Sequence, residues 1–293
     1  MSQPPAAPPS GPERVTIAEY RRRHAAGQVS LAAWDKVAIA QSECAALTGD
    51  PHALAYSDAV HAFWCALSGR DGYEAVRDET FPIDAATFLP RPFPYSSDSP
   101  AAVAHYLGAV AATVGEMGLP VGASVIEYGS GWGHMALTLA ATGYRVTAVD
   151  INADSVALLR QRAAAMQVPL EVVQSGFLDY EPAAPVDGIV FFEAFHHCAQ
   201  PFVLLDRCVA QLRDGGRMLF VADALYDDFY APWGVRLDGA AAFVTAQYGW
   251  LELGFRRDFF TAELERRGCD VTWKTWPWLG AYGTVLTATK RTR

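Results

Sequence analysis

The 293-residue sequence predicts an α/β fold built on a mostly parallel β-sheet. Three observations support this prediction. From residue 123 onward, short runs of β-branched and aromatic residues alternate with segments of helical periodicity. A glycine-rich turn follows the first of these runs and opens a helix. An acidic residue ends the second run. Helix-length connections between strands imply parallel pairing with right-handed crossovers.

Seven strands are expected in this part of the chain. The first five cover residues 124–128, 145–150, 170–174, 186–192 and 216–222, with helices over 132–142, 154–167 and 202–212 between them. The C-terminus adds a helix near 260–267 and strands near 270–274 and 283–289. Ligands on such sheets bind beyond the carboxyl ends of the strands, where the strand order reverses.

The region before the sheet has a different character. A Pro/Ala/Ser-rich stretch predicts a disordered tail over 1–12, followed by an N-terminal helical cap region over 13–98 and a ligand-binding domain over 99–293. Thr16-Ile17-Ala18-Glu19 is a capping box and predicts a helix to about Gly27. Asp98 and Ser99 before Pro100 predict a second helix start, running to about Met117.

An aromatic-rich insertion over 224–256 follows the fifth strand. We expect it to hang over the strand ends as a substrate lid, although a satellite hydrophobic cluster would explain its aromatic content equally well. Candidates for lining an acceptor pocket are Arg91, Tyr95, His105, Trp233, Tyr248, Trp250 and Glu252. Each of these, taken singly, is more readily explained by packing than by contact with an acceptor.

Composition excludes several classes of protein. The formal net charge of −9 argues against a protein that grips the phosphate backbone of nucleic acid. No apolar run reaches the roughly 18–20 residues that a membrane helix needs. The five cysteines show no CxxC pairing, which fits buried thiols in a reducing compartment. We therefore expect a cytoplasmic protein without membrane insertion, nucleic-acid partner or bound metal.

The turn Glu127-Tyr128-Gly129-Ser130-Gly131-Trp132-Gly133 carries the strongest functional signal. Its glycines permit a sharp turn and close approach of a ligand, and the following helix presents free N–H groups. Asp150 ends the next strand, where a carboxylate can accept ribose hydroxyls. A dinucleotide fingerprint would require a small residue at position 134, which is His134. This spacing favours S-adenosylmethionine (SAM) over NAD.

At these residues the sequence resembles the class I SAM-dependent methyltransferases, closely over about 99–223 and more loosely over 257–290. The resemblance rests on 125–133, on Val149-Asp150-Ile151-Asn152, on 186–197 and on Leu212-Arg213-Asp214-Gly215-Gly216-Arg217. It implies a Rossmann-like, seven-stranded sheet whose last strand is antiparallel. It also implies that Glu127 lies near the methionine amino end and that Tyr128, Gly129, Ser130, Gly131 and Gly133 belong to the methionine cradle. Asp150 would hold the ribose and Ile151 would flank the adenine.

One departure concerns the adenine. The family usually has an acidic residue just after the third strand, whereas this sequence has Gln174-Ser175-Gly176-Phe177. The adenine contact then falls to backbone, to Ser175 or to Asp179. We keep Ser175, Gly176 and Phe177 as predicted cofactor-binding residues, with Phe177 flanking the ring.

Candidate catalytic residues follow the fourth strand. His197, preferred over His196, is a candidate general base because the unperturbed pKa of histidine is about 6.5. A loop histidine bonded to backbone is the alternative. Glu193 faces the cleft and is a candidate for orienting an acceptor or contacting the cofactor. A metal site at His196-His197-Cys198 is disfavoured, because adjacent side chains point in different directions and the spacing fits no zinc pattern.

The sequence thus predicts a SAM-dependent methyltransferase that acts on a small or medium polar acceptor and releases S-adenosylhomocysteine (SAH). O-methylation of a sugar-containing or secondary metabolite is favoured. A catalytically silent SAM-binding scaffold and an NAD-dependent oxidoreductase are the alternatives. The sequence leaves the acceptor and the oligomeric state open.

Overall fold

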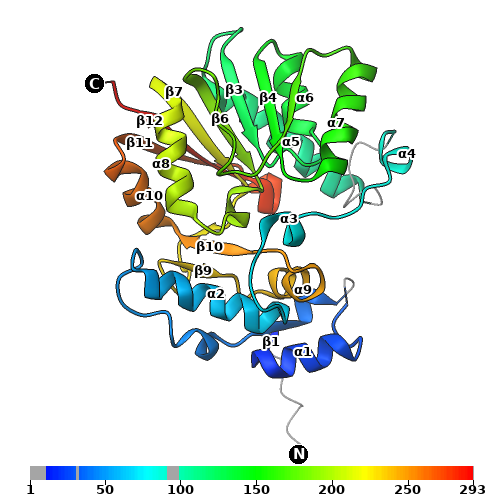
Figure 1. Ribbon diagram of the computed structural model, residues 1–293, viewed down its shortest axis with the longest axis vertical. Coiled ribbons are helices and arrows are strands. Elements are labelled where there is room, and N and C mark those ends of the chain that lie inside the picture. The colour runs from blue at the N-terminus through cyan, green and yellow to red at the C-terminus, as the bar shows by residue number, and fades with distance from the viewer. Residues whose placement is uncertain (1–10, 31–32, 91–98, 293) are drawn as a thin grey trace, which may run out of the picture.

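The computed structural model describes residues 11–30, 33–90 and 99–292. Two layers are visible in Figure 1, an α/β domain above and a smaller cap below. Most of the expected tail, residues 1–10, and the candidates Arg91 and Tyr95 lie outside the described residues.

The α/β domain contains a seven-stranded sheet with the order β11-β12-β7-β6-β3-β4-β5. Its strands are β3 (Ser124–Tyr128), β4 (Arg145–Asp150), β5 (Glu171–Gln174), β6 (Val186–Phe192), β7 (Leu212–Val221), β11 (Cys269–Thr275) and β12 (Thr284–Lys290). Strands β3 to β7 pair in parallel, and β12 is antiparallel to both of its neighbours. The predicted mostly parallel sheet with an antiparallel last strand is confirmed.

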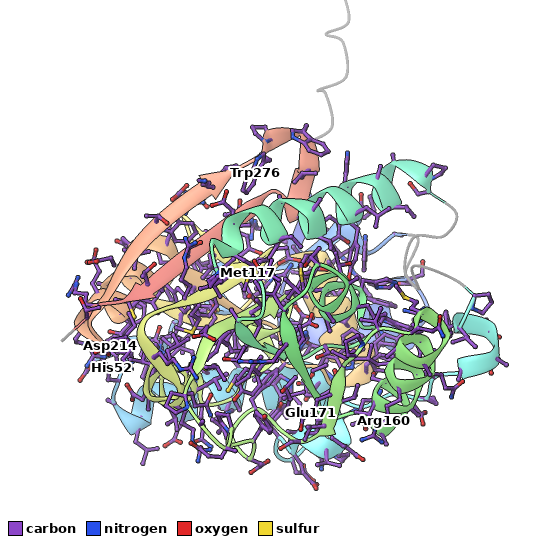
Figure 2. The ribbon with its side chains drawn as sticks, turned by 90° about the horizontal axis from the view of Figure 1, so that it is seen from above. His52, Met117, Arg160, Glu171, Asp214 and Trp276 are labelled. Atoms are coloured by element: carbon purple, nitrogen blue, oxygen red, sulfur yellow. The ribbon has the colours of Figure 1, made fainter. Side chains whose placement is uncertain are left out.

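Helices cover both faces of this sheet. One face carries α5 (Pro100–Met117), α6 (His134–Ala141) and α7 (Ala153–Met166), and the other carries α8 (Pro201–Gln211) and α10 (Arg257–Arg266). Alternation along β3 sends Val125 to the first face and Ile126 to the second, as expected for a strand buried on both sides. Met117 closes α5 and is buried against the sheet (Figure 2). The short helix η4 (Pro277–Tyr282) packs beside α5.

Two of the predicted helix starts are confirmed in atomic detail. The Thr16 side chain accepts a hydrogen bond from the backbone N–H of Glu19, at 3.2 Å, and caps α1 (Ile17–Ala25). The Ser99 hydroxyl likewise accepts from Ala102, at 3.3 Å, ahead of Pro100 in α5. Both side chains satisfy N–H groups that a helix start leaves without a partner.

The cap is assembled from two distant stretches of chain. The N-terminal stretch provides β1 (Glu13–Val15), α1, η1 (Trp34–Lys36), β2 (Val37–Ile39), η2 (Gln41–Cys44), α2 (Leu54–Ser68) and α3 (Ala75–Asp78), whereas α4 (Ala85–Phe88) packs beside α7 of the α/β domain (Figure 1). The insertion after β7 provides β8 (Leu225–Tyr226), β9 (Trp233–Val235), α9 (Gly239–Tyr248) and β10 (Leu253–Arg256). Strands β8, β10 and β9 form a small sheet, and α9 packs on α2 (Figure 1).

Buried hydrogen bonds join the two stretches. The Tyr56 hydroxyl donates to the Trp233 carbonyl at 2.8 Å, and Trp64 Nε1 donates to the Gly249 carbonyl at 3.2 Å. The Tyr56 and Trp64 side chains are both buried. The aromatic residues of the insertion therefore serve largely to pack the N-terminal helices, and Trp250 is the residue of 224–256 that reaches the cavity described below.

Replacing Trp64 tests the contact between the N-terminal stretch and the insertion. We expect Trp64→Phe to lower the free energy of unfolding by about 1–3 kcal/mol, because a buried carbonyl loses its donor. Trp64→Ala should cost about 3–5 kcal/mol through the additional loss of buried area. Leu54→Ala in the same helix, at a side chain that is 77% exposed, is the control and should stay within about 0.5 kcal/mol. Urea unfolding measures all three. If Trp64→Ala were as stable as the wild type, the contact would not stabilise the fold.

Candidate functional site

A cavity of about 490 Å³ lies at the carboxyl ends of β3, β4, β5 and β6, where the strand order reverses. The predicted site residues that line it are Glu127, Gly129, Ser130, Gly131, Asp150, Ile151, Ser175, Gly176, Phe177, Glu193 and His197. The cap closes the other side with Tyr73, Glu79, Phe81 and Trp250. The structure thus gathers residues of both layers around one space.

Three predicted site residues do not line the cavity. The Tyr128 ring lies on the opposite face of β3, where its hydroxyl donates to Gln211 Oε1 at 2.9 Å. Gly133 is the N-cap of α6 and faces Leu159, and the His196 ring turns away toward Asp223. Side chains alternate between the faces of a strand, which explains the orientation of Tyr128. Gly133 and His196 lie beyond the ends of β3 and β6, where the chain turns away from the cavity.

The glycines of the turn have separate tasks. Gly129, Gly131 and Gly133 all have positive φ, at 69°, 48° and 80°. A Cβ on Gly129 would lie 2.6 Å from the Ala194 Cβ, and one on Gly133 would lie 2.1 Å from Leu159 Cδ1. A Cβ on Gly131 would meet no described atom closer than 3.9 Å. Gly129 and Gly133 therefore allow packing within the protein, whereas Gly131 leaves space open at the cavity wall.

Asp150 ties this turn to β4. Its Oδ2 accepts a hydrogen bond from the Gly131 N–H at 2.7 Å, and its Oδ1 accepts from the Asn152 N–H at 2.8 Å. Burial raises the pKa of Asp150, and these two N–H donors oppose that rise. Each carboxylate oxygen has a further lone pair, so the side chain is held in place while it can still accept ligand hydroxyls.

Glu127 has an unsatisfied oxygen at the same wall. The residue is 2% exposed, and its Oε2 has no hydrogen-bond partner among the described residues. Burial raises the pKa of Glu127 well above its ordinary range. A buried carboxyl without a partner is costly. Its place on the cavity wall fits an ammonium group of a ligand, as in the methionine moiety of SAM. The open space at Gly131 fits the same moiety.

The loop after β5 forms the far end of the cavity. The Ser175 backbone N–H donates to the Asp150 carbonyl at 2.9 Å, and a Cβ on Gly176 would lie 2.6 Å from Asp179 Oδ2. Ile151 and the Phe177 ring add apolar wall. Both Ser175 and Asp179 line the cavity, so the choice of adenine contact remains open between them and the backbone.

His197 pairs with a residue that the sequence analysis did not select. Its Nδ1 lies 3.2 Å from Glu79 Oε2, although the two groups are not aligned for a hydrogen bond. Glu79 Oε1 is fixed by the Tyr73 hydroxyl at 3.0 Å and by the Leu251 N–H at 2.8 Å. Burial lowers the pKa of His197, but the Glu79 carboxylate, together with Glu252 and Asp223, outweighs burial and raises the pKa to about 9.

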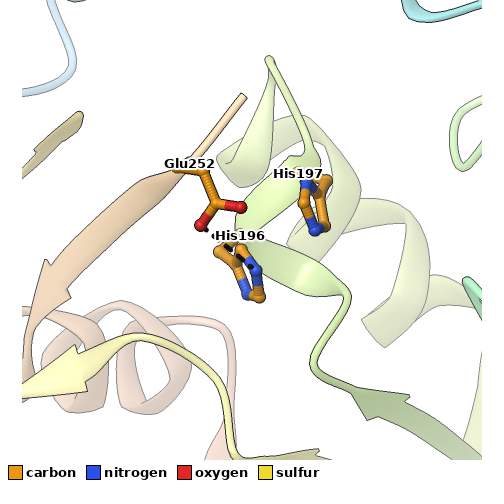
Figure 3. Close-up of side chains that lie close together, drawn as sticks. All are labelled: His196, His197 and Glu252. Carbon is orange, nitrogen blue, oxygen red and sulfur yellow. Dashed lines mark ion pairs between the residues drawn. The ribbon is translucent and has the colours of Figure 1, made fainter. Parts of the chain in front are cut away.

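His196 occupies a different environment beneath the cavity. Its Nδ1 lies 2.8 Å from Asp223 Oδ1, and its Nε2 lies 3.8 Å from Glu252 Oε2 (Figure 3). Burial, then the neighbouring His197, lowers the pKa of His196 to about 3. The ring is therefore neutral at physiological pH, and its place behind the wall suits support of the loop.

His196, His197 and Glu252 also come within metal-ligand spacing, with one ligand atom of each lying within 4.8 Å of the others (Figure 3). The expectation that the adjacent histidines point apart is wrong, because the short helix η3 (Phe195–His197) brings their ring centroids to 4.3 Å. Each group already has a protein partner, however. Arg236 Nη1 donates a hydrogen bond to Glu252 Oε2 at 2.9 Å.

Glu193 stands at the end of β6 with its carboxyl open to the cavity. Its φ is 49°, which is rare for a residue with a side chain. The surrounding protein and the Asp223 and Glu252 carboxylates raise the pKa of Glu193 to about 8. The predicted orientation toward the cleft is therefore observed.

Sequence reasoning missed the contribution of the N-terminal stretch to the wall. Tyr73, Glu79 and Phe81 line the cavity, and Tyr73 bonds to His197 across 124 residues of sequence. No motif marks these positions, because the chain enters the cavity there as an irregular segment. Of the other candidates, His105, Trp233, Tyr248 and Glu252 do not line the cavity.

Comparisons with known proteins agree with this geometry. A family model described as a methyltransferase domain matches residues 125–216, the stretch that holds the glycine turn, Asp150 and the histidines. These residues are similar to that family, and the sheet has the class I fold of SAM-dependent methyltransferases.

Individual relatives match longer stretches of the chain, but only part of their own length. A SAM-dependent Diels-Alderase, iccD, of Talaromyces variabilis is 33% identical over 113 residues, which cover 37% of this chain and 39% of that protein. A ubiquinone biosynthesis O-methyltransferase of Paramagnetospirillum magneticum is 30% identical over 159 residues, which cover 51% and 60%. The chain therefore spans less than two thirds of either relative.

Among solved structures, magnesium protoporphyrin IX methyltransferase of Synechocystis PCC 6803 with bound SAH gives a TM-score of 0.53 at 12% identity. The match covers 71% of this chain and 93% of that one. This likeness concerns the fold alone. In the described parts of the chain, no helix is both long and apolar enough to cross a membrane.

The glycine assignments predict a graded effect on stability. Gly131→Ala should cost only the strain of positive φ, about 1–2 kcal/mol, because its Cβ has room. Gly122→Ala is the matched control, since φ is 85° and no heavy atom lies within 4 Å of the added Cβ. Gly133→Ala should lose about 1–3 kcal/mol more by overpacking against Leu159. Urea unfolding would contradict this assignment if Gly133→Ala matched the other two.

The pairing of His197 with Glu79 predicts a titration. By NMR of the imidazole nitrogens, His197 in the wild type should titrate near pH 9. In Glu79→Gln the pKa should fall below 9, because the carboxylate that faces Nδ1 is removed while burial still lowers the pKa. Glu74→Gln, five residues earlier on the same segment, is the control and should leave the His197 titration unchanged. A midpoint that stays near 9 without Glu79 would refute the pairing.

Proposed function

We propose that this protein is a SAM-dependent methyltransferase that O-methylates a small or medium polar metabolite. The observation that supports this best is the shared cavity. A Gly131–Asp150–Glu127 wall suited to the donor continues into a wall that holds a histidine backed by a carboxylate. We favour an acceptor of the sugar-containing or secondary-metabolite kind. Its identity, and the expected cytoplasmic location, stay predictions.

SAM fits the residues present at the donor end. Asp150 would accept the ribose hydroxyls, and Glu127 Oε2 would accept the methionine ammonium, whose charge would favour the ionised carboxylate. Gly129 and Gly131 would let the backbone approach the methionine moiety. Ile151 and Phe177 would flank the adenine, with Ser175 and Gly176 beside it.

When bound, SAM supplies a methyl group on a positively charged sulfur, and the carbon–sulfur bond breaks with its electron pair passing to sulfur, which leaves neutral SAH. The protein aligns the acceptor oxygen and excludes water, which is worth roughly 7–11 kcal/mol in well-oriented reactions. The cap residues Phe81 and Trp250 close the cavity for this purpose.

His197 is the proposed general base, and Glu79 its positioning residue. Because Nδ1 faces Glu79, Nε2 is the nitrogen that would take the proton of the acceptor hydroxyl. Such a base contributes typically 10²–10⁴-fold. The neutral form of His197 grows as pH rises toward 9, so transfer should accelerate with pH over this range. His196 would act by supporting the loop, and Glu193 by binding the acceptor.

A second candidate binds SAM without transferring its methyl group. The relative in Talaromyces variabilis supports it, because its name describes a cycloaddition. Incubation with a metabolite pool and SAM carrying a labelled methyl separates the two candidates. Methyl transfer yields labelled product, heavier by one methylene unit, together with SAH. Bound SAM that remains intact after incubation favours the second candidate.

Calorimetry tests the donor site directly. We expect the wild type and Gly122→Ala to bind SAH equally well. Gly131→Ala should bind at least about tenfold more weakly, a loss of about 1.4 kcal/mol, because the added methyl fills the cradle. The two variants carry the same kind of backbone strain, so a difference in affinity reports on the cavity. Absence of SAH binding to the wild-type protein would overturn the proposed function.

A further inference from the structure

The carboxyl of Glu193 has no hydrogen-bond or ion-pair partner in the part of the chain that the structure describes. The backbone N–H of this residue donates to the Val221 carbonyl at 2.9 Å, which fixes the main chain at positive φ. The side chain opens onto the cavity, and no hydrogen bond or ion pair to its carboxyl is found among residues 11–30, 33–90 and 99–292. The other acidic groups nearby differ, since Glu252 binds Arg236 and Glu79 faces His197.

The surroundings of Glu193 are negative. The Asp223 side chain is 1% exposed and its Oδ2 has no partner among the described atoms. Burial, then Asp223 and Glu252, raise the pKa of Glu193 to about 8, while His197 and Arg236 lower it by less. Without a ligand, the carboxyl is therefore mostly protonated at neutral pH. A cation placed beside it would favour ionisation, with release of the proton.

The described cavity wall is rich in acidic side chains, and its one basic residue, His197, faces Glu79. It includes the acidic residues Glu74, Glu79, Glu127, Asp150, Asp179 and Glu193, and no described lysine or arginine lines it. The aromatic residues Tyr73, Phe81 and Trp250 line the cap side. Aromatic faces attract cations, and acidic walls repel carboxylates and phosphates. The acidic and the aromatic side chains thus both favour a cationic ligand.

We propose that the methyl acceptor carries a protonated amine, which binds Glu193, in addition to the hydroxyl that is methylated. This inference rests on the proposed function and narrows its substrate class to amine-bearing hydroxyl compounds. A protonated amine has no lone pair to attack a methyl group. The amine is therefore the anchor, and the oxygen near His197 is the nucleophile.

Charge-matched probes test the anchor without knowledge of the natural acceptor. The SAH-loaded protein, in EDTA at neutral pH, is titrated with 2-phenylethylammonium, 2-phenylethanol and 3-phenylpropanoate. We expect the ammonium to bind at least about tenfold more tightly than the alcohol, as for a hydrogen bond to a charged group, and the carboxylate to bind most weakly. Calorimetry in buffers of different ionisation enthalpy should show proton release with the ammonium alone.

Two variants assign the preference to Glu193. Glu193→Gln should abolish both the preference for ammonium over alcohol and the proton release, while its SAH affinity stays that of the wild type. Glu181→Gln removes an exposed carboxylate outside the cavity wall and should retain both signals.

Several results would overturn the anchor. They are equal or undetectable binding of ammonium and alcohol, a preference that survives in Glu193→Gln, or a preference that requires a divalent metal in place of EDTA. A loss of SAH affinity in Glu193→Gln with the probe preference intact would assign the residue to the donor instead. Because every titration starts from SAH-loaded protein, failure of the anchor is distinct from failure of SAH binding.

Discussion

The hydrogen bonds that Asp150 accepts are the constraint on which the site depends. With one oxygen on the Gly131 N–H and the other on the Asn152 N–H, this carboxylate holds the loops after β3 and β4 against each other. The turn keeps its left-handed glycines in place, Gly131 stays open to the cavity, and Glu127 remains on the wall with an unsatisfied oxygen. A parallel sheet places all these ends at one edge, so a few backbone bonds organise the donor site.

The cap supplies the residues that surround His197. Glu79 reaches His197 from the N-terminal stretch, and the Leu251 N–H from the insertion fixes that carboxylate. The pKa of His197 therefore depends on three segments of the chain, which are its own loop after β6, the N-terminal stretch and the insertion. One consequence is that two neighbouring histidines differ, since the pKa of His196 is lowered to about 3 and that of His197 is raised to about 9. Burial lowers the pKa of both rings, and the neighbouring His197 lowers that of His196 further, whereas Glu79, Glu252 and Asp223 raise that of His197.

The sequence was informative where function depends on local backbone geometry. The seven-stranded sheet, the antiparallel last strand and the capped helices followed from periodicity, capping residues and the family resemblance, and the structure confirms them. The sequence also predicted that Gly131, Asp150 and Glu127 lie at the ligand site, because a turn between a strand and a helix needs its residues in a fixed order. The sequence was less informative about side-chain direction. Tyr128 and His196 belong to matching motifs, yet their rings point away from the cavity.

By itself, the sequence predicted the fold class and the cavity wall around Gly131, Asp150 and Glu127, because both depend on residues that are close along the chain. Only the tertiary structure decided which residues form the cap side of the cavity. It brought Tyr73 and Glu79 to His197, turned the insertion toward α2, and left the Glu193 carboxyl without a partner among the described residues. These relations join residues far apart in sequence, and their chemistry arises from distance, burial and charge, which no local pattern encodes.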